Sequence, residues 1–496
     1  MTRKTKYPLI ITGLFFILSI LMIGCSKENN NINKIFIGDE PSIKNHLKQQ
    51  DIESGEISIE QLIIHGEKLF TARFNSLDGF GRPQSSGNRT RRDKKLFPEN
   101  FNRISGPETS ACSDCHNMPI VGGGGSNVTN VFSSAEKSPF LDFETEDIGK
   151  DITIKEIGNE RNTLGMFGSG LVELLAREMS KDLISQRASA EIISLNESRN
   201  VRIELISKGI SFGYLTAKSN GTLDTSEIVG VDKDLIIKPF TQKGVVPSLR
   251  VFTNNAMNHH HGMQSSETFE DREDIHKAMD LLSDSKDHDG DGVINELTIG
   301  DITALTIFQA LLPIPQWIEP KTNIEKEAAK NGEKLFIQTG CTDCHKPQLP
   351  LKNTLFSDPG PFNPKNHLSP EDTKGIFVDL KDYYPNLKTN NNGELLIPLF
   401  SDLKRHKMGD LLNNEKVKQL ATRNNVATDQ WITKKLWGFA SEPPFLHHGR
   451  ATLISEAIKV HGGEAENSKQ NFMNLNEIEQ SHIVEYLKTF QIQEVK

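Results

Sequence analysis

The sequence predicts a mainly α-helical protein made of two similar units, with a mixed α/β insertion in or after the first unit. Residues 65–70 (HGEKLF) are repeated at 331–336 (NGEKLF), and each copy precedes a Cys-x-x-Cys-His pattern. Between the two patterns, residues 201–240 alternate between apolar and polar side chains as strands do, and Asn220-Gly221 is typical of a hairpin turn. The expected architecture therefore has two helical units and a strand-rich region between them.

The composition is that of a globular protein. The chain has 496 residues, of which 36% are hydrophobic and 25% are charged, so a mainly disordered chain and a multi-span membrane protein are both excluded. This length exceeds one ordinary hydrophobic core and suffices for two or three domains. Because 57 Lys and Arg stand against 66 Asp and Glu, the net charge is −9, which argues against a nucleic-acid partner.

The N-terminus has the pattern of a secreted lipoprotein. A positively charged start and an apolar run, too short for a comfortable membrane span, precede Cys25, and residues 22–25 (MIGC) resemble a bacterial lipobox. We therefore predict a signal peptide over 1–24, a lipid on Cys25 and a tether over 25–60. The alternative is an uncleaved anchor helix. Both place the globular part on the periplasmic or cell-surface side of a bacterial membrane.

The four remaining cysteines form two copies of Cys-x-x-Cys-His, which is the attachment pattern of c-type haem. Two thiols reach the vinyl groups of one porphyrin, and the histidine that follows binds the iron from the proximal side. A four-thiolate zinc site or a redox-active cysteine pair are the alternatives, but neither requires a histidine after both pairs. We predict two covalently bound haem c groups. Their attachment and proximal residues are Cys112, Cys115, His116, Cys341, Cys344 and His345.

Each motif belongs to one expected domain, the first over 61–320 and the second over 321–496. In the second domain a helix that starts near residue 324 leads directly into the cysteines, and residues 474–490 have the apolar spacing of a closing helix. In the first domain a longer insertion separates the repeat from the motif. Its five basic residues over 89–95 indicate a solvated loop or, alternatively, a partner for haem propionates or an acidic protein.

An acidic loop predicts a calcium site near the end of the first domain. Residues 287–296 (DHDGDGVINE) resemble the first part of an EF-hand loop, although Thr298 stands where the bidentate Glu is usual. Hard oxygen ligands at alternate positions suit Ca²⁺. The alternative is an acidic turn without a metal. The candidate ligands are Asp287, Asp289, Asp291 and Glu296.

Together with the haem motifs, four stretches make the chain similar to a known family. They are residues 106–125, 252–263, 401–409 and 436–465. The chain resembles the di-haem oxidoreductases, also labelled peroxidases, and is more distantly similar to bacterial di-haem cytochrome c peroxidases. In the last stretch His448 stands where the peroxidases usually have Asp. The resemblance implies two cytochrome c-like haem domains and a haem-dependent oxidoreductase.

The ligands on the distal sides of the two irons are less constrained by the pattern. At the first haem, three adjacent histidines over 259–261 offer a ligand or an acid–base group, and we select His260 and His261. A surface histidine cluster or a network around calcium or propionates is the alternative. At the second haem, Met408 is the candidate distal ligand; His406 competes with it, and Met408 as a core residue is the third reading.

The expected reaction passes electrons from a donor protein or a small reductant through one haem to a small oxidant, such as peroxide, at the other. A nearby His or Glu would move the proton that cleavage of an O–O bond needs. Arg161 and Arg450 are candidates for pairing with haem propionates. The alternative is a non-enzymatic periplasmic electron-transfer lipoprotein, and an accessory role in metal uptake also stays open.

Overall fold

The computed structural model describes most of the chain beyond the N-terminal segment. The described residues are 40–80, 110–125, 128–129, 161–263, 265–268, 296–315, 317–364, 367–413 and 426–492. The predicted signal peptide, Cys25, the basic run over 89–95 and the three calcium-candidate aspartates lie outside them. Residues 41–496 form one compact unit. None of the described helices has both the length and the apolar character that crossing a membrane requires.

One group of helices surrounds the first cysteine motif. It consists of α1 (Gln49–Ser54), α2 (Ile59–Thr71), α3 (Cys112–Cys115), α7 (Leu249–Ala256) and α9 (Ile299–Ala310). Helix α9 is buried on all sides. Most of its side chains are therefore apolar, and its polar side chains need hydrogen-bond partners. Residues 41–58, which we expected to belong to the tether, pack on this helix instead: Ile43 and Ile52 are buried, and Thr298 donates to the Leu47 carbonyl.

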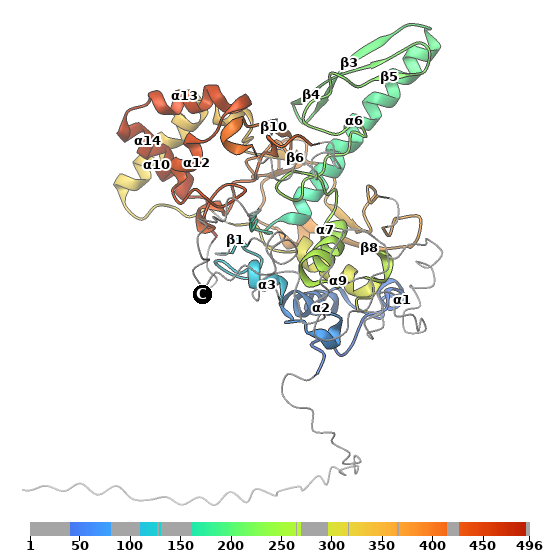
Figure 1. The fold of residues 1–496 in the computed structure, drawn as a ribbon. Helices are drawn as coiled ribbons and strands as arrows, with labels where there is room; N and C mark the ends of the chain where they lie inside the picture. The colour runs from blue at the N-terminus through green and yellow to red at the C-terminus, as the bar shows by residue number, and fades with distance from the viewer. Residues whose placement is uncertain are drawn as a thin grey trace, which may run out of the picture. The chain divides into compact units, whose positions relative to one another are not determined.

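A second group of helices lies together (Figure 1), and Cys341 of the second motif packs against its core. It consists of α10 (Asn323–Gln338), α12 (Ile454–Lys459), α13 (Glu466–Asn474) and α14 (Glu477–Lys488). Helices α10 and α14 match the two helices predicted for this region. Their shared core is built from aromatic side chains such as Phe336 and Phe472.

The sequence repeat has the same structural role in both groups. A Cβ added to Gly66 would lie 2.2 Å from the Ala304 carbonyl oxygen, and one added to Gly332 would lie 1.9 Å from that of His482. Only glycine therefore allows α2 to approach α9, and α10 to approach α14, this closely. The sequence repeat therefore corresponds to two equivalent helix crossings, one beside each cysteine motif.

The strand-rich insertion is a three-stranded antiparallel sheet beside a long helix. Strands β3 (Val201–Ser207), β4 (Ile210–Ala217) and β5 (Leu223–Asp224) pair in that order and lie along α6 (Ser169–Asn196) (Figure 1). The predicted Asn220-Gly221 turn connects β4 to β5, with Gly221 at a φ of 81°. The hairpin prediction is confirmed.

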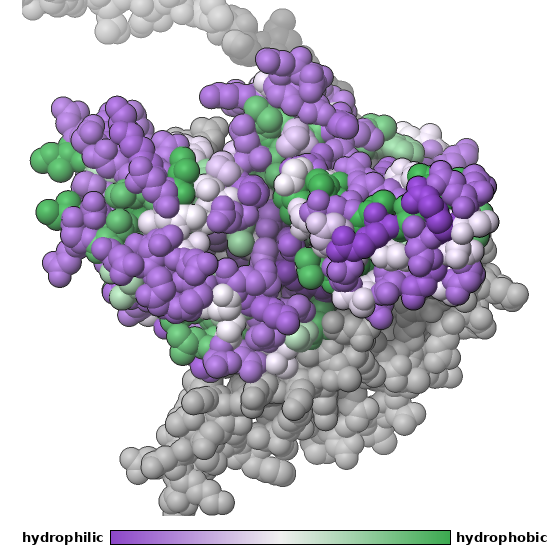
Figure 2. All heavy atoms as spheres, turned by 90° about the horizontal axis from the view of Figure 1, so that it is seen from above, coloured by the Kyte–Doolittle hydropathy of each residue, from purple (hydrophilic) through white to green (hydrophobic). Residues whose placement is uncertain are grey.

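Strands also occur in regions without an alternating sequence pattern, so the fold is mixed rather than mainly helical. The described residues form four further antiparallel pairs. They are β1 (Val128–Thr129) with β2 (Arg161–Asn162), β6 (Leu349–Leu351) with β9 (Leu395–Ile397), β7 (Leu355–Asp358) with β8 (Ile376–Asp379), and β10 (Arg405–Lys407) with β11 (Gln430–Ile432). Segments of two to four residues are too short to display an alternating pattern. The face drawn in Figure 2 is mostly hydrophilic, with hydrophobic residues in separate patches.

A buried ion network joins the two expected domains. Arg250 of α7 is fully buried and donates to Glu267 at 2.5 Å and to Asp358 of β7 at 2.6 Å. Its guanidinium also donates to Thr303 of α9 at 3.0 Å. Residues from both sides of position 320 therefore meet in one interior, and the division at that position stays a prediction.

Candidate functional site

Both cysteine motifs form a single helical turn that closes on the histidine. The His116 amide donates to the Cys112 carbonyl at 2.9 Å in α3, and the His345 amide donates to the Cys341 carbonyl at 3.0 Å beside the short helix η5 (Cys341–Asp343). All four thiols are free of disulfides and half-buried. Each turn thus presents two thiols and one imidazole from five consecutive residues, as covalent haem attachment needs.

The alternative uses of these cysteines find no support in the geometry. Burial raises the pKa of the Cys112 thiol to about 12, whereas a redox-active cysteine has a lowered pKa. Among the described residues, the four thiols do not converge into a group that could hold a metal ion. A shared zinc site is therefore not formed.

Both motifs open into the same cavity, which has a volume of about 930 Å³. Ligand pockets usually measure roughly 300–1,000 Å³, so this one is large. All six motif residues named above line it, together with the two phenylalanines of the sequence repeat, Phe70 and Phe336. The Trp437 indole nitrogen also lies at this cavity and, within the described part of the chain, has no hydrogen-bond acceptor. An acidic group of a bound cofactor would supply one.

The two motif histidines share one arrangement. His116 Nδ1 lies 3.3 Å from the Gly123 carbonyl oxygen, and His345 Nδ1 lies 3.0 Å from that of Phe400. Burial lowers the pKa of each to about 4, so each imidazole is neutral near pH 7. When Nδ1 carries the proton and donates it to a carbonyl, Nε2 is left with a lone pair for a metal. This is the state that a proximal haem ligand requires.

The predicted distal histidines lie beside the first motif. They belong to the π-helix η3 (Met257–His261), which extends α7 and ends at Gly262 with a φ of 70°. His261 is buried, with its Nε2 3.6 Å from Cys112 Sγ, and His260 lines the cavity. Single π-turns often occur at functional sites. The structure thus brings both residues to the first motif, and iron binding by either stays a prediction.

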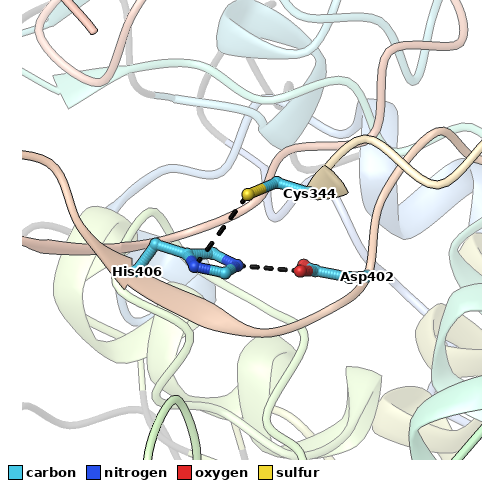
Figure 3. A group of neighbouring side chains, drawn as sticks. All are labelled: Cys344, Asp402 and His406. Carbon is cyan, nitrogen blue, oxygen red and sulfur yellow. Dashed lines mark hydrogen bonds and ion pairs between the residues drawn. The ribbon is translucent and has the colours of Figure 1, made fainter. Parts of the chain in front are cut away.

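Beside the second motif, Figure 3 shows His406 held between other side chains. Its Nε2 lies 2.8 Å from Asp402, its Nδ1 lies 2.7 Å from Glu464, and Cys344 Sγ is 4.0 Å away. Burial opposes protonation of this ring, but the hydrogen bonds to Asp402, Cys344 and Glu464 outweigh it and raise the pKa to about 11. An imidazolium has no lone pair for iron. Met408, which lines the cavity, is therefore the better candidate ligand of the two.

Cys344, Asp402 and His406 have donor atoms close enough to hold a metal ion. Their geometry is nevertheless explained without one, because both ring nitrogens of His406 already bind carboxylates. The group is best understood as the surroundings of the second motif.

Basic side chains line the cavity in a protein of net negative charge. Arg161 of β2, Lys243, Lys434 and Lys435 all face it. Lys243 Nζ lies 3.6 Å from the centre of the Trp431 ring, which in turn stacks at 3.7 Å on a histidine of the resemblance segment, His447. The prediction for Arg161 is consistent with this lining. Arg450 is exposed and does not line the cavity.

A half-buried glutamate that is absent from the predicted site residues, Glu442, also lines the cavity. Glu442 accepts hydrogen bonds from the backbone amides of Gly124 and Gly165, and the Lys435 ammonium donates to the Gly165 carbonyl. Burial raises the pKa of Glu442, and Lys435 acts in the opposite direction. Nothing in the local sequence marks this glutamate, since its partners are distant along the chain.

One calcium candidate lies within the described residues. Glu296 is buried, and its side chain packs against Gly79, where an added Cβ would lie 2.4 Å away. Its three predicted partners lie outside the described residues, so the loop geometry stays a prediction.

Comparison with known proteins identifies the C-terminal region. Residues 385–490 match the family model described as "Di-haem oxidoreductase, putative peroxidase". The predicted family resemblance is confirmed. The matched segment contains Met408, Glu442 and the Trp431–His447 stack, and it begins after the second cysteine motif.

Two solved structures were aligned with this chain. Hydrazine synthase of Kuenenia stuttgartiensis gives a TM-score of 0.21 at 17% identity, over 40% of this chain and 57% of that chain. A MauG-like protein associated with microbial copper homeostasis gives 0.28 at 13% identity, over 55% of this chain and 77% of that chain. Both scores are too low to support an inference. No curated protein matches the sequence.

Proposed function

We propose that this chain is a di-haem c-type oxidoreductase with peroxidase-like activity. Electrons enter from an external donor at the second motif and reach a small oxidant, such as peroxide, at the first. The observation that carries the proposal is the shared cavity, into which two neutral, carbonyl-bonded imidazoles and all four thiols open. When bound, haem supplies one-electron redox chemistry and an iron position at which a small oxidant can bind.

The residues around the two motifs support different roles. At the second motif, Met408 supplies a thioether, and a methionine ligand raises the reduction potential, which suits electron entry. At the first motif, His260 lies on the cavity wall, where an imidazole can hold or release a proton near neutral pH. Arg161 and the cavity lysines would pair with the propionates of a bound haem, whose charges would otherwise be buried without a counter-charge.

The remaining sequence expectations complete the proposal. The signal peptide and lipid on Cys25 would hold the protein at the outer side of a bacterial membrane, where c-type haem is attached and a donor protein can be reached. Calcium bound by the loop that ends at Glu296 would brace the region beside the first motif.

Intact mass and ligand-binding spectroscopy test the proposed function. Protein made in cells with a complete cytochrome maturation system should carry two haems, and Cys112→Ala/Cys115→Ala or Cys341→Ala/Cys344→Ala should each remove one. Cyanide and peroxide titrations in the oxidised and half-reduced states should find one open iron. If both irons are permanently six-coordinate and peroxide is not turned over, the peroxidase proposal is wrong and the protein is a non-enzymatic electron-transfer carrier. A colourless protein of polypeptide mass would refute both.

A further inference from the structure

Two peptide groups connect Glu442 to the proximal histidine of the first motif. In the Gly123–Gly124 peptide, the carbonyl accepts from His116 Nδ1, and the amide at the other end donates to Glu442. In the Leu164–Gly165 peptide, the carbonyl likewise faces the His116 ring, and the amide again donates to Glu442. The Glu442 carboxylate therefore binds the amide N–H of each peptide group whose carbonyl oxygen contacts the His116 imidazole.

Steric fit indicates that this contact is specific. A Cβ added to Gly165 would lie 2.1 Å from Glu442 Oε1, and one added to Gly124 would lie 2.9 Å from the Glu442 Cβ atom. Neither glycine has a positive φ, so close approach, and not backbone conformation, explains glycine at both positions. Burial raises the pKa of Glu442, whereas the nearby Lys435 ammonium acts in the opposite direction and favours the charged carboxylate.

A charge at one end of a peptide group changes the hydrogen bond at the other end. Linked hydrogen bonds polarise one another, so an anion at the amide makes the carbonyl a stronger acceptor. A stronger acceptor at Nδ1 makes a metal-bound imidazole more basic, and such outer contacts adjust the redox potential of the metal. A more basic imidazole favours the oxidised iron.

The second motif differs in this respect. Its His345 donates to the Phe400 carbonyl, and the nearby carboxylates of Asp402 and Glu464 bind the His406 ring. The two proximal imidazoles are therefore surrounded by different charges, although their local turns are alike.

We propose that Glu442 is a positioning residue for the first haem, which through the Gly123–Gly124 and Leu164–Gly165 peptides strengthens the hydrogen bonding of His116 Nδ1 and lowers the midpoint potential of that iron. The inference rests on the proposed function only in requiring a haem at the first motif. It makes a segment of the C-terminal half responsible for the electronic state of the N-terminal haem.

Glu442→Gln and Gly165→Ala test the proposal in the full-length holoprotein. The first variant removes the charge, and the second displaces the carboxylate while retaining its charge. Both should shift the iron–imidazole band of the first haem to lower frequency in resonance Raman spectra and raise its midpoint potential. The band is assigned in Cys341→Ala/Cys344→Ala, which keeps the first haem. Glu464→Gln is the matched control: it removes a carboxylate beside the second motif and should leave the first-haem band in place.

The outcomes separate this proposal from its rivals. If Glu442→Gln raises the potential while the band stays unmoved in both variants, the carboxylate acts only as a distant charge and the proposal is wrong. If one variant does not accumulate, the other variant tests the proposal alone: a band at lower frequency supports it, and an unmoved band contradicts it. Haem content is measured by mass in each sample, so absence of haem from the unmodified protein would refute the proposed function, and an unshifted band in a fully loaded variant would refute this inference.

Discussion

Single side chains decide which atoms remain available to iron at the second motif. His406 and Met408 are two residues apart, but the ring of His406 is occupied on both sides by carboxylates, whereas Met408 lines the cavity. The sequence pattern favoured Met408 but did not exclude His406, because one of the two carboxylates that bind the ring, Glu464, is 58 residues from His406. The distinction comes from tertiary packing.

Met408→His should lower the midpoint potential of the second haem, since an imidazole replaces a ligand that raises it. Spectroelectrochemical titration of the purified protein measures this. Met473→His is the control, because Met473 is 45% exposed and does not line the cavity, so that its replacement should leave both potentials unchanged. An unchanged potential and spectrum in Met408→His would make Met408 a core residue.

The haem attachment residues could be predicted at this scale because they are adjacent in the chain. The spacing of Cys112, Cys115 and His116 is itself the chemical requirement, and it repeats at the second motif. Glu442 could not be predicted, since its role depends on the amides of Gly124 and Gly165, which are hundreds of residues away. Residues that act through backbone groups leave no type-specific pattern.

At the scale of elements, the Arg250 network holds α7, and therefore the π-helix that follows it, against α9 and β7. Arg250→Met leaves Glu267 and Asp358 as buried charges without their cation and should destabilise the protein by about 3–5 kcal/mol. Urea unfolding monitored by circular dichroism measures the loss. Arg202→Met is the matched control: its partner Glu227 is exposed, so about 0–1 kcal/mol is expected. Equal losses would contradict the argument.

The segment over 41–58 should detach from α9 as the pH rises. His46 Nδ1 lies 2.6 Å from Asp301, which is buried and also binds His65 at 2.8 Å. Burial opposes protonation of His46, but Asp301 outweighs it, so folding raises its pKa above 6.5. The ion pair therefore contributes its full stabilisation to the folded state below pH about 6.5. This contribution is lost as the pH rises through the higher folded-state pKa of His46.

Hydrogen exchange of amides in this segment, corrected for intrinsic rates, should show protection falling as the pH rises above about 6.5. His46→Gln should remove most of this pH dependence while leaving amides of α14 unaffected. Protection that is independent of pH in the unmodified protein would refute the role of the His46–Asp301 pair.

Among the elements, long helices and the hairpin were predictable, but the short strand pairs were not. Helices α10 and α14 carry an apolar face over several turns, and Asn220-Gly221 has turn chemistry of its own. Strands such as β10 and β11 contain three residues each and pair across more than twenty positions, so only tertiary contacts define them.

At the scale of the whole molecule, the larger of two hydrophobic cores crosses the expected domain boundary, while the helices around the second motif keep a smaller core of their own. A continuous core runs from Ile43 to Ile492 and includes Leu351 and Phe356 of the second half beside Leu171 and Phe308 of the first. The Tyr384 hydroxyl donates to the Leu312 carbonyl at 2.8 Å across the same boundary. Two haem units built on a repeat need not be two folding units, because each buries part of its apolar surface against the other.

Leu351→Ala tests this coupling. Leu351 is fully buried in β6, so its truncation should destabilise the core by about 2–5 kcal/mol. Because that core is shared, the denaturant midpoint read from the absorbance of the first haem should fall together with that of the second, although Leu351 follows residue 320. Leu355 on the next strand is 45% exposed, so Leu355→Ala should change the free energy of unfolding by less than about 0.5 kcal/mol and leave both midpoints nearly unchanged. A fall confined to the second haem would show that 61–320 and 321–496 unfold as separate domains.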